Sequence, residues 1–196
     1  MEFQAESIRA GTDIKPFRKQ YRLFHAAIAQ FCSTGAQVAV AGAFINYIVE
    51  TRLEANVPTP VDNAVRILAG AHLIFTLGRF AGSTLKFVVR PRWVLFIFMT
   101  ACMIFTGPAI SGRGDTGMIM IVFVLFCESI CFPTIVGLGM RGLGKYSKRG
   151  SGFIVAGVAG GAVVPPLLFM FSDRVDAQHP TALALTVPLT ILTVAW

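Results

Sequence analysis

The sequence predicts an all-α protein that spans a membrane, and three observations support this fold class. Hydrophobic residues make up 55% of the 196 residues and charged residues only 14%, whereas soluble domains carry ~25% charged residues. Six apolar stretches follow one another, and the five full ones have roughly 18–26 residues, enough to cross a ~30 Å hydrocarbon core as helices. None alternates strictly between apolar and polar residues, as transmembrane strands do.

The apolar stretches divide the chain into an arm and a bundle. Residues 1–22 are polar and lack the early apolar core of a signal peptide, so we expect a cytosolic arm. Residues 23–196 are expected to form the bundle. Its spans are predicted at about 25–49, 64–89, 93–110, 118–140, 152–171 and 181–196.

Residues that cap helices precede three of the predicted spans. Asn63 precedes the second span, Asp115 or Thr116 the fourth, and Ser151 the fifth. The sixth span is still apolar at Trp196, and its residues would reach only ~24 Å as a helix. We therefore expect an incomplete last helix and a chain that is a fragment of a longer product.

Basic residues collect at one end of the predicted spans. The arm and the connections after the second and fourth spans, with nearby Arg79, hold 13 of the 17 basic residues. Because such residues mark the cytoplasmic side, we expect a cytoplasmic N-terminus in a multi-pass protein of the plasma membrane. The net charge of +7 then reflects topology and attraction to anionic lipid, and we expect no nucleic-acid partner.

The sequence shows no set of residues that would carry out catalysis. There is no Ser–His–Asp arrangement, no spacing of metal ligands and no phosphate-binding glycine loop after a strand. The four cysteines all lie in apolar segments, as inert buried thiols do. We expect neither an enzyme nor a bound metal or cofactor.

The first span carries four polar residues that are candidates for substrate binding. On a helical wheel, Gln30, Thr34 and Gln37 fall within about 60° of one another and form one polar stripe. Asn46 falls on nearly the opposite face, unless a bend near Gly42 turns it. Such a stripe either holds helices together or lines a watery cavity.

Two charged residues and one histidine lie within or at the ends of spans. A carboxylate such as Glu128 at mid-bilayer costs roughly 2.5–3.5 kcal/mol, so it couples protons or substrate, or pairs with a neighbouring helix. His72 is interpreted as a packing residue or a pH sensor. Arg79 is interpreted as an interfacial anchor or a latch to another helix.

The fifth span contains small residues and two prolines. Gly157, Gly160 and Gly161 share one face, where small residues let helix backbones approach closely. Pro165 and Pro166 remove backbone donors and should bend the outer half of the span. Two interpretations stay open, static packing or a gating movement.

Four stretches resemble a known family: "GAQVAVAGAFINYIVE" (35–50), "GRFAGSTLKF" (78–87), "FPTIVGLGMRGLG" (132–144) and "GGAVVPP" (160–166). From about Arg18 the chain resembles the second half of a major facilitator transporter. The group is the fucose/glucose/galactose:proton symporters, fucose permease-like and of fungal type.

The resemblance implies a six-helix half of the major facilitator fold, with a sugar bound between two halves by alternating access. It places Gln37 on the sugar-facing side of its helix and makes "GRFAG" a cytoplasmic latch motif. It also implies that the proton-coupling carboxylates lie in the N-terminal half, which is missing here. One departure is Cys32–Ser33–Thr34, where family members often carry aromatic residues.

The expected function is therefore transport of a monosaccharide, L-fucose or hexose-like, by proton symport in the full-length form. The chain alone should be inactive, because half of the cavity wall is absent. The alternative is a non-transporting membrane protein, either a degenerate fragment or a helical bundle that binds a partner. A channel is disfavoured because the sequence has no rings of pore-lining charge.

Overall fold

The computed structural model describes residues 17, 20–112 and 114–172, and within them it contains helices and no strand. The predicted span at 181–196 and most of the arm lie outside the described residues. The elements are α2 (Tyr21–Glu54), α3 (Val61–Val88), α4 (Pro91–Ser111), α5 (Asp115–Gly139), η2 (Gly144–Tyr146), α6 (Ser147–Ala156), η3 (Gly157–Ala159) and α7 (Gly160–Ser172).

Five stretches of the described chain are long and apolar enough to cross a membrane. They are Tyr21–Glu54, Val61–Val88, Pro91–Ala109, Asp115–Gly139 and Ser147–Leu167. The last of these runs through α6, the short 3₁₀ segment η3 and the first part of α7.

The helices begin earlier than the capping residues suggested. The N-cap of α3 is Pro60 and that of α5 is Gly114, so Asn63 and Asp115 lie inside their helices. Ser151 lies in the middle of α6 rather than before it. Apolar residues mark the part of a helix that meets hydrocarbon, whereas the helix itself continues through polar residues at either end.

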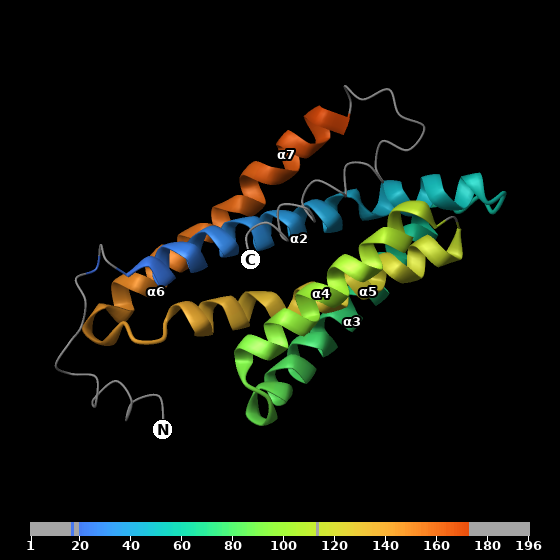
Figure 1. The fold of residues 1–196 in the computed structure, drawn as a ribbon. Helices are drawn as coiled ribbons and strands as arrows, with labels where there is room; N and C mark the ends of the chain where they lie inside the picture. Colours follow the sequence, from blue (N-terminus) through green and yellow to red (C-terminus); the bar gives the residue numbers. More distant parts are fainter. Residues whose placement is uncertain (1–16, 18–19, 113, 173–196) are drawn as a thin grey trace.

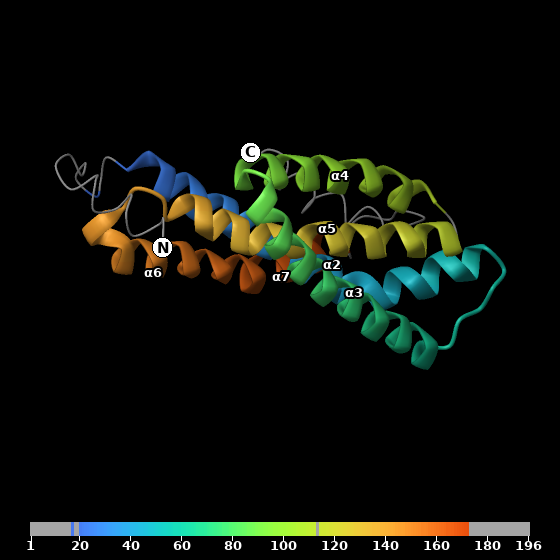
Figure 2. The same cartoon turned by 90° about the horizontal axis from the view of Figure 1, so that it is seen from below.

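The middle of the structure is formed by α5, which packs against α2, α3 and α4. Figure 1 shows α4 alongside α5, and α6 and α7 alongside α2. Seen from below in Figure 2, α5 lies between α4 and the helices α2 and α3 over part of its length. Small, aliphatic and aromatic side chains fill these contacts, with Leu95 and Ile135 in one buried cluster and Phe44 and Ile121 in another.

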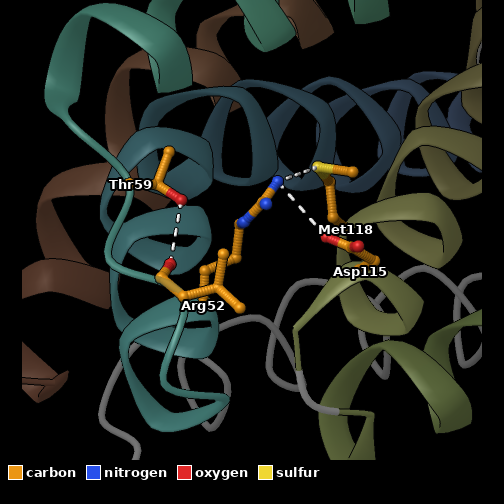
Figure 3. A network of polar contacts seen from close by, with 5 residues as sticks. Arg52, Thr59, Asp115 and Met118 are labelled. Carbon is orange, nitrogen blue, oxygen red and sulfur yellow. Dashed lines mark hydrogen bonds and ion pairs between the residues drawn. The ribbon is translucent and has the colours of Figure 1, made fainter.

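Polar contacts fasten the end of α2 to the start of α5. The Arg52 guanidinium lies 3.2 Å from a carboxylate oxygen of Asp115 and 3.7 Å from the Met118 sulfur (Figure 3). The Gly114 N–H donates to the Thr51 carbonyl at 3.0 Å. Gly114 adopts φ +62°, a left-handed conformation that glycine tolerates without strain, and this permits the tight turn into α5.

Candidate functional site

The polar stripe of α2 divides into a buried part and an accessible part. Gln30 is fully buried and Thr34 nearly so, and the Gln30 side-chain nitrogen donates to the Thr34 hydroxyl at 2.8 Å. The amide oxygen of Gln30 has no hydrogen-bond partner among the described residues. Gln37, about one turn further along, is half-buried.

The glycines of the fifth span cover the buried part of the stripe. A Cβ atom at Gly157 would lie 2.7 Å from the Ala27 carbonyl oxygen, and one at Gly160 would overlap the Phe31 carbonyl oxygen. A Cβ atom at Gly161 would lie 3.4 Å from the Thr34 methyl carbon. The two helices therefore meet backbone to backbone, and Gln30 and Thr34 lie within this contact, which we call the glycine seam.

The prolines of the fifth span follow the glycine seam. The helix tightens to a 3₁₀ turn at Gly157–Ala159, and α7 then runs without interruption through Pro165 and Pro166. Pro165 is buried and Pro166 is exposed. The departure from regular α-helix thus precedes the prolines and coincides with the closest approach to α2.

Beyond the glycine seam, one side of α2 is only partly covered by the described residues. On this side Val38 packs near Gly161, and the Phe169 ring would lie 3.7 Å from a Cβ atom at Gly42. Between positions 36 and 49 the residues that escape burial are Gln37, Val38, Ala41, Gly42, Ile45, Asn46 and Val49. We call this set the uncovered face of α2. α2 continues as a single helix through Gly42, so no break in the helix there turns Asn46 towards Gln37. Both carboxamides lie on the uncovered face because this face extends far around the helix.

Glu128 occupies a different position, inside the helix contacts of α5. Its side chain is 2% exposed, and neither carboxyl oxygen has a hydrogen-bond partner among the described residues. The adjacent Cys127 and nearby Cys131 belong to a buried cluster of apolar residues. A buried carboxylate without a partner is costly, so this group needs either a proton or a partner from elsewhere.

Arg79 and His72 lie on the exposed side of α3. The Arg79 guanidinium stacks over the Phe75 ring, 4.8 Å from its centroid, and His72 Nδ1 lies 2.9 Å from the Leu68 carbonyl oxygen. Each of these contacts is made within α3. Among the described residues, the Arg79 guanidinium makes no hydrogen bond or ion pair with another helix.

The sequence reasoning missed the role of the glycines around Arg79. A Cβ atom at Gly78 would overlap the Ser129 hydroxyl, and one at Gly82 would overlap the Ile130 side chain. These two glycines therefore allow α3 to pack closely on α5. The signal was present in the sequence, because two small residues four positions apart favour close contact between membrane helices.

Curated proteins with similar sequences are sugar transporters. The chain is 37% identical over 162 residues to the "L-fucose-proton symporter" of Escherichia coli. The aligned region covers 80% of this chain and 35% of that protein. It is 31% identical to a "Putative glucose/galactose transporter" of Helicobacter pylori (83% of this chain, 39% of that protein) and 28% identical to the "Glucose/galactose transporter" of Brucella abortus (80% and 37%). The chain thus spans well under half the length of these relatives, and no family model matches it.

Solved structures show the same fold. The chain superposes on a crystal structure of the major facilitator superfamily transporter FucP in the outward conformation with a TM-score of 0.74 and 28% identity, covering 98% of this chain and 45% of that one. A second structure, of the E. coli fucose:proton symporter FucP, gives a TM-score of 0.75 over 94% and 47%. The described residues therefore have the all-helical fold of this transporter superfamily, and the protein is a multi-pass integral membrane protein.

Proposed function

We propose that this chain forms the second six-helix half of a carrier that moves a monosaccharide together with protons, because its similarities support the fucose/glucose/galactose:proton symporter-like family of the major facilitator superfamily. The proposal includes a partner half that would supply the other wall of the sugar site. It also includes the fungal form of the family, which the sequence motifs suggest.

The observation that carries the proposal is the uncovered face of α2. Gln37 and Asn46 lie on this face, among small and aliphatic residues. Each carboxamide offers two N–H donors and one carbonyl acceptor, which matches the mixed donor and acceptor character of sugar hydroxyls. The small Ala41 side chain, one turn from Gln37, leaves room for a ring to approach the helix, whereas the space beside Gly42 is taken by the Phe169 ring.

The buried pair of the polar stripe has a supporting role in this proposal. Gln30 bonds to Thr34 within α2, and the glycines of the fifth span cover both side chains. The pair is therefore assigned to the packed contact and not to the sugar. The direct contacts are thereby assigned to Gln37 and Asn46.

The orientation in the membrane also belongs to the proposal. Residues 1–22 would form a cytosolic arm and residues 23–196 the six-helix bundle, with the N-terminus on the cytoplasmic side of the plasma membrane. The excess of Lys and Arg at that side supports this orientation. Without its partner half the chain would have one wall of a sugar cavity and would not transport.

The proposal is tested by measuring sugar uptake with the partner half restored. The first half of the E. coli L-fucose-proton symporter would be fused ahead of this chain and expressed in cells that lack sugar uptake of their own. We expect saturable uptake of radiolabelled L-fucose or a hexose that collapses when a protonophore removes the proton gradient. Each half expressed alone serves as the control and should show none, whereas full uptake by this chain alone would contradict the proposal.

A further inference from the structure

A cavity of about 610 Å³ opens where α2 begins and α5 ends. Its walls come from the first turns of α2, the α3–α4 connection and the last turns of α5. Four of the residues that line it are arginines: Arg22, Arg90, Arg92 and Arg141. This cavity, which we call the arginine pocket, is separate from the uncovered face of α2.

The four arginines are attached to short, well-defined pieces of backbone. Arg90 and Arg92 flank Pro91, the first residue of α4, so the proline ring restricts the backbone between them. Arg141 follows the end of α5 within two residues. A Cβ atom at Gly139 would lie 2.6 Å from the Ala26 Cβ, so α2 and α5 are in close contact at the pocket wall.

Within the part of the chain that the structure describes, no carboxylate lines the arginine pocket to balance its charge. None of its lining residues is Asp or Glu. Most acidic residues of the described chain lie toward the other ends of the helices, and Glu128 is buried within α5. The ion pair between Arg52 and Asp115 is also at the far end of α2. Four like charges around one cavity produce a positive potential that attracts an anion.

The chemistry of the pocket selects among anions. The arginine guanidinium is a planar fork that binds phosphate oxygens in pairs. Ala29 and Ile135 add apolar wall beside the arginines, which suits a ligand with a charged group and an apolar body. Near Arg90 and Arg92, the large side chains Phe87 and Trp93 are exposed, as expected where helices end at a lipid surface.

We propose that the arginine pocket binds a phosphate group, the chemistry shared by anionic phospholipid headgroups and soluble phosphate compounds. The position at the ends of membrane-spanning helices favours the lipid as the source, because basic pockets between such helices bind lipid headgroups. The site does not depend on the sugar carrier proposed above, since it shares none of the residues assigned to the sugar.

The test measures lipid retention by the purified full chain. Native mass spectrometry in neutral detergent would compare binding of phosphatidylglycerol and phosphatidylcholine to the unchanged chain, Arg141→Gln, Arg141→Lys and Arg66→Gln. Arg66 is an exposed arginine of α3 outside the pocket and provides the matched control. We expect preference for phosphatidylglycerol and about fivefold weaker binding in Arg141→Gln. Arg141→Lys, which keeps the charge but loses the planar fork, should bind at an intermediate level, and Arg66→Gln should bind near-normally.

A second arm distinguishes the source of the phosphate. The lipid-free chain would be titrated with pyrophosphate while its thermal unfolding is followed. One outcome is that pyrophosphate stabilises the unchanged chain but not Arg141→Gln, while the chain shows no preference between the two lipids. This outcome supports the phosphate site and assigns it to a soluble ligand. Equal lipid binding by Arg141→Gln and Arg66→Gln, together with no pyrophosphate effect, would overturn the proposal, as expected if the arginines instead meet carboxylates of a partner protein segment.

Discussion

Replacing Gly160 with alanine tests the glycine seam most severely. In the structure a Cβ atom at this position would overlap the carbonyl oxygen of Phe31 and crowd the neighbouring backbone atoms of α2. A flexible side chain could rotate away from such a clash, but the backbone of a long helix cannot. We therefore expect α2 and α7 to be forced apart. Gly152→Ala is the matched control, because a Cβ atom at Gly152 of α6 meets nothing within 4 Å.

The magnitude follows from two opposing contributions. Overpacking of a tight contact costs about 1–3 kcal/mol, and a clash with backbone belongs at the upper end of this range. Exchanging glycine for alanine in a helix contributes roughly 0.5–1 kcal/mol in the stabilising direction. Gly160→Ala should thus lower the free energy of unfolding by about 1–2 kcal/mol, whereas Gly152→Ala should raise it by about 0.5–1 kcal/mol.

The assay is thermal unfolding of both variants in the same neutral detergent. The resulting difference of ~1.5–3 kcal/mol between the two variants corresponds to roughly 3–12 °C in Tm for a chain of this size. The reasoning would be refuted if the two variants unfolded at the same temperature. That result would mean that α2 and α7 do not approach as closely as the structure shows.

Three further predictions concern single side chains. In the fused carrier, Gln37→Ala should raise the KM for sugar uptake about tenfold, as expected for one lost polar contact worth ~1.4 kcal/mol. The control Asn63→Ala should leave the KM unchanged. If Gln37→Ala and the unchanged carrier had the same KM, Gln37 would not belong to the sugar site. Glu128→Gln should abolish the dependence of uptake on external pH if this buried carboxyl exchanges a proton during transport, and an unaltered pH profile would leave it a structural role. Tyr47→Phe should lower the free energy of unfolding by ~1 kcal/mol, because the buried hydroxyl donates to the Ala109 carbonyl; an unchanged denaturation midpoint would contradict this hydrogen bond.

The sequence predicted the helical membrane fold well, because long apolar stretches have few other solutions. It also predicted that the glycines of the fifth span allow close packing. It could not identify Phe31 and Ala27 as the residues whose backbone these glycines contact. The spacing of small residues shows that a helix can be approached closely, but it does not show which residues approach it. For the same reason the helical wheel grouped Gln30 with Gln37, although the neighbouring helix buries only Gln30.

The arginine pocket shows a second kind of limit. The sequence placed Arg90 and Arg141 in connections on the same side of the membrane by counting basic residues. Only the packing of α2, α4 and α5 shows that these connections converge on one cavity. Convergence depends on helix positions in three dimensions, which the periodicity of a single sequence does not contain.

The most direct test of the sugar site is protection of the uncovered face of α2 by sugar. In the fused carrier, with Cys32 replaced by alanine, Gln37→Cys, Asn46→Cys and Ile28→Cys would each be labelled with a membrane-permeant maleimide. Ile28 is an exposed residue of α2 outside the uncovered face. We predict that saturating L-fucose or hexose slows labelling severalfold at positions 37 and 46 and leaves position 28 unchanged. Equal labelling rates with and without sugar at all three positions would contradict the account.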